Sequence, residues 1–252
     1  MTTESKNLML IYKAWLETRW RFLAGLLLLG AISLYAVVRA PEIIAAREQF
    51  DAESLPFAKY LWILLYKGYF QALWIVSAVI LGLGGLWQEQ ATGSANFTLS
   101  LPVSRKLLVI TRAAVGASEA VILAIVPLLL IWAFSPLAGY SFPLNEAVLH
   151  AVLIIGGGLV FYAWGVLLSH IMRNEFSVIT LALSVCLVLY IAFNLLRVEI
   201  YNPFDLMSGK HYLDPDTFLL RGDLPWLPVG VYLAISATLI FLAAKIAERR
   251  DF

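Results

Sequence analysis

The stretch FSVITLALSVCLVLYIAFNLL, residues 176–196, decides the fold, because it contains no charged residue along its whole length. A helix needs about 20 predominantly apolar residues to cross the hydrocarbon core of a bilayer. A strand of a membrane β-barrel instead alternates apolar and polar residues over about ten positions, and this stretch shows no such alternation. Because a helix satisfies its own backbone hydrogen bonds in lipid, the stretch predicts a transmembrane helix.

The composition of the whole chain agrees with that prediction. Of the 252 residues, 61% are hydrophobic and only 14% are charged, and the mean hydropathy is +0.83. Soluble domains carry about 25% charged residues, so a soluble enzyme and a disordered chain are both excluded. The net charge of +1 gives no basic field for binding nucleic acid, and the one cysteine, Cys186, cannot form an internal disulfide.

Five further blocks match residues 176–196 in length and apolar character. We therefore expect an all-α integral membrane protein with a single transmembrane domain over residues 1–252. The six expected spans are residues 22–38, 68–88, 107–135, 147–169, 176–196 and 224–246. In this scheme Glu119 is the one ionisable residue that lies well inside a span.

The distribution of charge between the spans indicates the orientation of the chain. With the N-terminus in the cytoplasm, eleven of the 18 basic residues fall on the cytoplasmic side, and most acidic residues fall on the other side. Cytoplasmic loops of membrane proteins carry an excess of Lys and Arg. Both termini are therefore expected in the cytoplasm, although the outer segment 39–67 carries four basic residues itself.

Residues 6–20 precede the first span and have the pattern of an amphipathic helix. The apolar residues that recur there at helical spacing are Leu8, Ile11, Tyr12, Trp15 and Leu16. A helix of this kind is suited to lying in the membrane interface. The pattern predicts an interfacial helix over residues 6–20, and the alternative is a cytoplasmic extension of the first span.

The outer segment 39–67 is rich in charges of both signs. Its part from Glu42 to Glu53 lacks Pro and Gly and can form a short surface helix, which Pro56 would end. A solvated linker is the alternative.

The second outer segment, residues 197–223, contains the turn signals Asn202-Pro203 and Asp214-Pro215. The part between these turns is half apolar, so it can dip back toward the membrane or pack on the outer mouth of the bundle. Four aspartates raise the question of a cation site, but their spacing fits no calcium-loop pattern.

Residues 89–106, between the second and third spans, form the most informative loop. Its middle can form a short helix, while Pro102 disfavours helix just before it and fits the first turn of a new helix. Ser100 or Ser104 can cap that new helix, which continues as the third span. The expected structure is a rigid bend, in which a short surface helix is followed by a proline break and a long span. Such a bend can transmit movement of a cytoplasmic partner to the membrane helices.

This loop resembles the corresponding loop in the permease subunits of ABC-2 type ABC transporters. The matching residues are Glu89, Gly93, Ser94, the block Leu-Pro-Val-Ser-Arg at 101–105 and the basic Arg112. Many members of that family have Gly-Lys where this chain has Thr111-Arg112, so the charge is kept. The tail 249–252 and the six spans with both termini inside are also similar to that family.

The resemblance implies that two permease subunits, identical or related, form the membrane unit of an exporter in a bacterial or archaeal cytoplasmic membrane. Each would bind a separate cytoplasmic ATPase chain that holds ATP and Mg²⁺, and no cofactor is expected in this chain. Residues 6–20 would be a connecting helix, and 197–223 would form short re-entrant helices. The residues expected to couple to the ATPase are Glu89, Gly93, Ser94, Phe97, Leu101, Pro102, Val103, Ser104 and Arg105.

The chain itself lacks a phosphate-binding loop, which needs the pattern Gly-x-x-x-x-Gly-Lys-Ser/Thr. Its one Gly-Lys pair, Gly209-Lys210, is followed by His211 and falls in the expected outer segment. We therefore do not expect this chain to be an enzyme. An intramembrane enzyme would also need several polar residues at one depth. A secondary transporter or channel and a non-transporting membrane scaffold are the alternative functions.

Glu119 and a group of glycines are the remaining features inside the spans. A carboxyl inside a bilayer is costly, so Glu119 is expected to line the translocation path or a dimer interface, or to be a packed or snorkelling side chain. The run Gly156-Gly157-Gly158 predicts close helix approach or a bend, and Gly82, Gly84 and Gly85 are interpreted in the same way.

Overall fold

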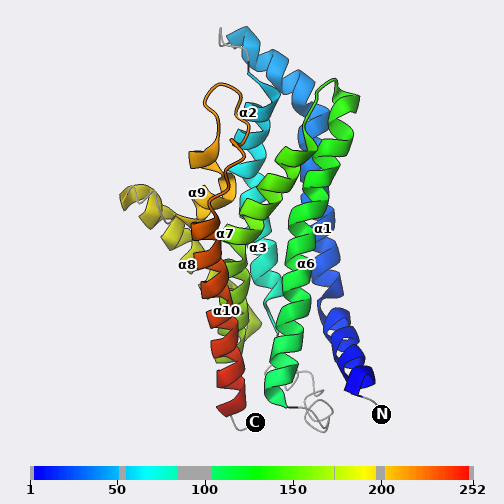
Figure 1. Ribbon diagram of the computed structural model, residues 1–252, viewed down its shortest axis with the longest axis vertical. Coiled ribbons are helices and arrows are strands. Elements are labelled where there is room, and N and C mark those ends of the chain that lie inside the picture. The colour runs from blue at the N-terminus through cyan, green and yellow to red at the C-terminus, as the bar shows by residue number, and fades with distance from the viewer. Residues whose placement is uncertain (1–2, 51–54, 85–103, 173, 197–201, 250–252) are drawn as a thin grey trace.

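Helices make up nearly all of the protein. The computed structural model describes residues 3–50, 55–84, 104–172, 174–196 and 202–249 (Figure 1). Within these ranges there is no β-strand, and an isolated bridge joins Leu213 to Leu220. The all-α prediction is therefore confirmed for the described part of the chain.

Six helices are long and apolar enough to cross a membrane, which confirms the predicted number of spans. Five of them are α1 (Thr3–Phe50), α6 (Arg105–Phe134), α7 (Leu144–Ile171), α8 (Glu175–Leu196) and α10 (Trp226–Arg249). The remaining span is assembled from α2 (Phe57–Leu61), the π-helical segment η1 (Trp62–Tyr66) and α3 (Tyr69–Leu81). Three short helices complete the described elements: η2 (Ser135–Ala138), α9 (Pro203–Ser208) and η3 (Lys210–Tyr212).

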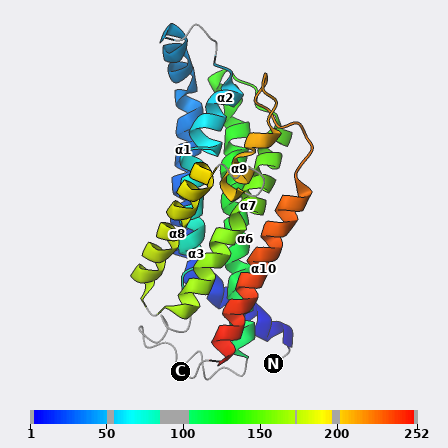
Figure 2. The same ribbon diagram turned by 90° about the vertical axis from the view of Figure 1, so that its left-hand side faces the viewer.

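The start of α1 and the end of α10 lie at the same end of the bundle (Figures 1 and 2). We call this the N/C end, and we call the opposite end, which carries α2 and α9, the distal end. An even number of spans returns the chain to the side on which it began. The end of α3 and the start of α6 also lie at the N/C end, so the connection between them is made there.

α1 is longer than the predicted first span, because it runs without interruption from Thr3 to Phe50 and contains Pro41. Residues 6–20 are helical, as predicted, but they form the beginning of α1 instead of a separate helix. Figure 2 shows this beginning leaning away from the axis of the rest of α1. At the other end, the surface helix expected from Glu42 onward is the continuation of α1, and Arg39 pairs with Glu42 one turn later.

The second span begins at Phe57, directly after Pro56, whereas the apolar block suggested a start at residue 68. Lys59 and Lys67 interrupt the apolar run, but each lies over an aromatic ring at the distal end, 5.0 Å from the centroid of Phe218 and 5.3 Å from that of Trp62. These cation–π contacts give each ammonium group a favourable partner at the distal end. The helical residues between Lys59 and Lys67 can therefore belong to the span.

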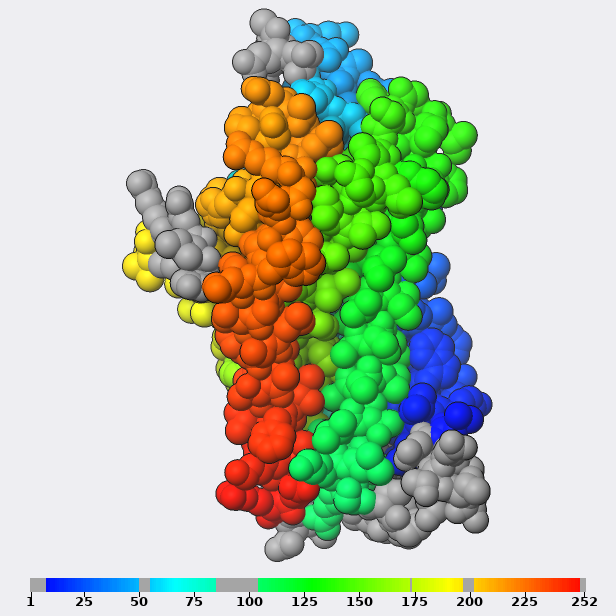
Figure 3. All heavy atoms as spheres, viewed as in Figure 1, coloured from blue at the N-terminus to red at the C-terminus, as the bar shows by residue number. Residues whose placement is uncertain are grey.

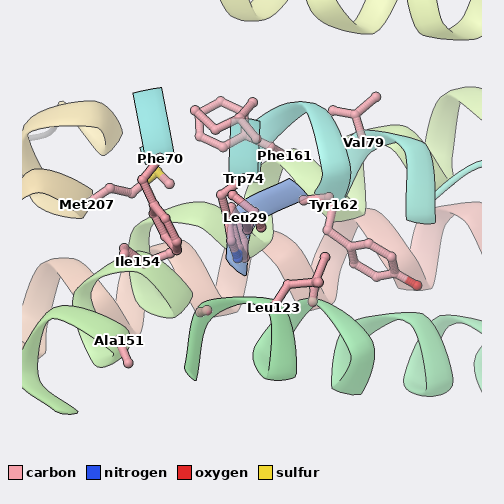
Figure 4. Packing of buried hydrophobic residues seen from close by; sticks show 14 of the residues in the cluster. Leu29, Phe70, Trp74, Val79, Leu123, Ala151, Ile154, Phe161, Tyr162 and Met207 are labelled. Carbon is pink, nitrogen blue, oxygen red and sulfur yellow. The ribbon is translucent and has the colours of Figure 1, made fainter. Parts of the chain in front are cut away.

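The buried core lies around α7, against which α3, α6, α9 and α10 pack. Figure 4 shows buried side chains of this core, among them Trp74, Leu123 and Ile154. A side chain at any of the three consecutive glycines of α7 would meet a neighbour. A Cβ at Gly156 would lie 2.9 Å from Val229, a Cβ at Gly157 would lie 2.9 Å from Met207, and one at Gly158 would overlap the ring of Trp74. The prediction of close helix approach at this run is confirmed, because α10, α9 and α3 all touch it.

Candidate functional site

The predicted coupling residues lie between α3 and α6, and the structure describes two of them, Ser104 and Arg105. Ser104 is the N-cap of α6, and its Oγ accepts a hydrogen bond of 3.2 Å from the backbone N–H of Leu107. Ser104 is therefore the cap of the third span, one of the two serines that the sequence allowed. The other predicted coupling residues lie outside the described residues: Glu89, Gly93, Ser94, Phe97, Leu101, Pro102 and Val103.

Two arginines bind the chain where it leaves the bundle after α3. Arg21 of α1 donates from Nη1 to the carbonyl oxygen of Leu83 at 2.8 Å, and Arg112 of α6 donates from Nη2 to the same oxygen at 3.2 Å. Leu83 directly follows Gly82, the C-cap of α3, so its carbonyl lies beside the negative end of the dipole of that helix. Both guanidinium groups are therefore placed where positive charge is favourable.

Each arginine also pairs with a carboxylate. Arg21 Nη2 lies 2.7 Å from Oε1 of Glu175 in the first turn of α8, and Arg112 Nη1 lies 3.0 Å from Oε2 of Glu17 in α1. We call the set Glu17, Arg21, Leu83, Arg112 and Glu175 the arginine clasp. Because its members come from α1, α6, α8 and the segment after α3, the clasp joins four parts of the chain at the N/C end.

The backbone at the clasp is held against α7 as well. Gly84 has φ +117°, a conformation that favours glycine, and its carbonyl oxygen accepts a hydrogen bond of 2.8 Å from Ser169 Oγ. A Cβ at Gly84 would overlap the guanidinium of Arg112, and a Cβ at Gly82 would lie 2.7 Å from the carbonyl oxygen of Tyr162. The predicted close approach at these two glycines is therefore confirmed.

Glu119 lies between α6 and α1, within the bundle of its own chain. It is 2% exposed, and Thr18 Oγ1 donates to its Oε1 at 2.5 Å. Its Oε2 is buried without a hydrogen-bond partner. The structure thus shows a packed carboxyl that contacts Thr18 in α1.

Two cavities flank α8 toward the distal end. One has a volume of 430 Å³ and lies between α3 and α8, and the other has a volume of 310 Å³ and lies between α8, α7 and α10. Cys186 lines both, Gln71 and Tyr190 line the first, and Trp164 and Tyr232 line the second. Most of their remaining lining is aliphatic or aromatic, so both cavities suit apolar groups.

The second outer segment packs on the distal end of the bundle. Glu146 in the first turn of α7 accepts a hydrogen bond of 3.0 Å from the backbone N–H of Leu220, and Trp62 donates one of 2.8 Å to the carbonyl oxygen of Ser208. In the described residues, no group of three His, Cys, Asp or Glu side chains is placed to hold a metal ion. Gly209 ends α9 with φ +68°, and Lys210 pairs with Asp205 at 3.3 Å.

The expected turn at Asp214-Pro215 is present. Asp214 Oδ1 accepts hydrogen bonds from the backbone N–H groups of Asp216 and Thr217, at 2.9 and 3.2 Å. These two hydrogen bonds lower the pKa of the Asp214 carboxyl below its ordinary value of 3.8. The aspartate therefore acts as the organiser of a turn.

Sequence reasoning did not pair Arg21 with Glu175, because 154 residues separate them and no local pattern links such positions. The charge count only placed both residues on the same side of the membrane.

Comparison with known families gives a match over most of the chain. A family model described as "ABC-2 family transporter protein" matches residues 19–220, which include every member of the arginine clasp except Glu17, the segment between α3 and α6 and most of the described spans. No curated protein matches the sequence.

Proposed function

Because the chain belongs to the ABC-2 family of transporter proteins, we propose that this multi-pass membrane permease is one subunit of an ATP-driven exporter. The family match carries the proposal. The six-span bundle supports it, since α3 ends and α6 begins at the same end of the bundle as the start of α1 and the end of α10. The proposed site is a bacterial or archaeal cytoplasmic membrane, with the N/C end in the cytoplasm, as the excess of basic residues there favours.

The energy source in this proposal is a separate ATPase chain that holds ATP and Mg²⁺. It docks on residues 89–106 at the N/C end, where the neighbouring backbone is held by the arginine clasp. A loop whose attachment to the bundle is held by several hydrogen bonds is suited to transmit a displacement to the membrane helices, because little of that displacement is absorbed by local flexibility.

The membrane unit in this proposal is a dimer that forms the translocation path beside α8. Of the most apolar stretch of α8, only 17% is buried, and its distal part projects from the bundle (Figures 1 and 3). Apolar side chains are exposed along this helix, including Leu187, Val188 and Ile191. An apolar helix that its own chain leaves uncovered is the surface on which we expect the second subunit.

The decisive experiment is purification of the chain together with the product of a neighbouring reading frame that encodes an ATPase with a phosphate-binding loop. We expect a stable complex whose ATP hydrolysis falls when residues 101–105 are replaced by alanine. Replacing Lys210 and His211 at the distal end is the matched control and is expected to leave hydrolysis unchanged. Failure of every such ATPase to bind would overturn the proposal.

The dimer is tested by oxidative cross-linking of Val188→Cys in a chain that also carries Cys186→Ala. We expect a disulfide-linked dimer in membranes. Ile122→Cys is the control, because Ile122 is similarly exposed but lies on α6. Equal cross-linking from both positions would argue against α8 as the contact.

A further inference from the structure

We propose that Arg21 transmits movement of the loop between α3 and α6 to α8, the helix that lines both cavities. This inference rests on the proposed function, because it needs an ATPase that moves the loop. In it Arg21 is a positioning residue, which holds Leu83 with one nitrogen and Glu175 with another.

The backbone that precedes the predicted coupling segment is held by hydrogen bonds. Leu83 lies six residues before Glu89, where the predicted coupling segment begins. Its carbonyl oxygen is bound by two guanidinium groups, and the next carbonyl, of Gly84, is bound by Ser169. A displacement of the loop therefore acts on Leu83 and on the arginines that hold it.

The two arginines that bind Leu83 have carboxylate partners on different helices. Arg112 pairs with Glu17, which lies on α1, whereas Arg21 pairs with Glu175, which lies on α8. In the part of the chain that the structure describes, Arg21 is the one side chain that hydrogen-bonds both to the segment after α3 and to α8. Movement at Leu83 thus has a polar connection to α8 through Arg21 and none through Arg112.

The freedom of α8 depends on its contacts with the rest of the bundle. Its fully buried side chains form a single stripe of Val178, Ala182 and Cys186. The hydroxyl of Thr180 and the amide of Asn194 donate to carbonyls of α8 itself. Among the described residues, the Arg21–Glu175 contact is therefore the hydrogen-bonded link between α8 and another helix.

The geometry gives this link leverage. Glu175 is the first residue of α8, and the 22 residues of the helix extend about 33 Å from it. The two cavities lie beside the middle and distal parts of α8, where Cys186 and Tyr190 contribute to their walls. If α8 moves as a rigid rod, a small rotation at Glu175 displaces Cys186 and Tyr190, in the cavity walls, further than it displaces the first turn.

The test follows a probe on α8 in the complete complex with its ATPase. An environment-sensitive fluorophore is attached to Leu187→Cys in a Cys186→Ala chain, and its emission is compared without nucleotide and after trapping with ATP and vanadate. We expect Arg21→Gln to reduce the nucleotide-dependent change by about 2- to 30-fold, the range of typical coupling effects. ATP hydrolysis by the complex should persist, because the loop is intact.

Two further variants separate transmission from simple stabilisation. Glu175→Ala leaves the bond from Arg21 to Leu83 in place but removes both the ion pair and the hydrogen bond to α8, so the same loss is expected. Arg112→Gln removes the other donor to Leu83 and leaves the α8 link, so the probe should still respond. The exchange Arg21→Glu with Glu175→Arg restores the ion pair and stability, but it removes the donor to Leu83 and should not restore the response.

The outcomes are distinct. A full probe response in Arg21→Gln and Glu175→Ala, or an equal loss in Arg112→Gln, would overturn the transmission role while leaving the exporter proposal standing. If no ATPase binds the unsubstituted chain, the exporter proposal fails and the inference fails with it.

Discussion

α7 and α8 are neighbours of similar apolar character, yet they have opposite places in the molecule. In the most apolar stretch of each helix, 72% of α7 is buried and only 17% of α8. α7 is the centre on which α3, α9 and α10 pack, whereas α8 projects from the bundle (Figure 1).

The difference between them is side-chain size. α7 contains Gly156, Gly157, Gly158 and Gly165, and at each a Cβ would lie 3.0 Å or less from another element. Lipid tails are as apolar as leucine, so apolarity alone does not bring helices together in a membrane, whereas small residues permit close packing. In this protein glycine content, and not hydropathy, distinguishes the core helix from the peripheral one.

The largest effect is expected from adding bulk to the two helices in turn. Gly158→Leu would force a side chain into the ring of Trp74, and overpacking of this kind costs about 1–3 kcal/mol or more. Ser184→Leu adds similar bulk at an exposed position of α8 and should change stability by less than about 0.5 kcal/mol. Thermal unfolding in detergent measures both. Equal destabilisation would contradict the size argument.

The next effect concerns polar side chains on the same two helices. Glu146→Ala in α7 leaves the buried N–H of Leu220 without its acceptor, which costs about 1–3 kcal/mol. Thr180→Ala in α8 removes an exposed hydroxyl that bonds only its own helix, so the change should be within about 0.5 kcal/mol. Faster hydrogen exchange of the 212–221 segment in the first variant would locate the loss, and unchanged exchange would refute it.

Glu119 gives an intermediate case on α6. Glu119→Gln keeps an oxygen that accepts from Thr18, so we expect a stability change below about 1 kcal/mol and unchanged ATP hydrolysis by the complex. Thr18→Val removes the donor and should cost more. A loss of hydrolysis in Glu119→Gln at normal expression and stability would instead assign the carboxyl a role in transport.

The smallest effect is expected in the distal turn at Asp214. Its folded pKa lies below the ordinary value of 3.8, so its carboxylate stabilises the turn above that value and this contribution is lost as the pH falls through the lower, folded pKa. Hydrogen exchange of the Asp216 and Thr217 amides should therefore accelerate in acid relative to unstructured amides. Asp214→Asn should show no such pH-dependent step.

The fold could be predicted as far as the arrangement of apolar blocks determines it. The spans containing α6, α7, α8 and α10 begin and end within a few residues of the expected positions, because charged or turn residues flank them. The start of the second span could not be placed from hydropathy, because Lys59 and Lys67 interrupt the apolar run. The ring that Lys59 contacts, Phe218, is distant in sequence. The extent of α1 was also hidden, since the uncharged block ends before Arg39 whereas the helix continues to Phe50.

The residues of the candidate site also fall into a part that local sequence predicts and a part that it does not. Local signals identified Ser104 as a cap and Gly82 and Gly84 as positions of close approach. The partners of Arg21 are 62 and 154 residues away, so only the folded bundle brings them together. Local patterns therefore found the position of the loop, whereas its connection to α8 required the tertiary structure.

The length of α1 has a practical consequence. Its 48 residues extend about 72 Å as a helix, more than twice the roughly 30 Å hydrocarbon thickness of a bilayer. Arg21 and the charged turn around Glu42 thus belong to one continuous helix that is longer than a bilayer is thick. In the proposed orientation, a dye attached to the distal end of α1 is carried by the same helix that holds Arg21 at the cytoplasmic surface.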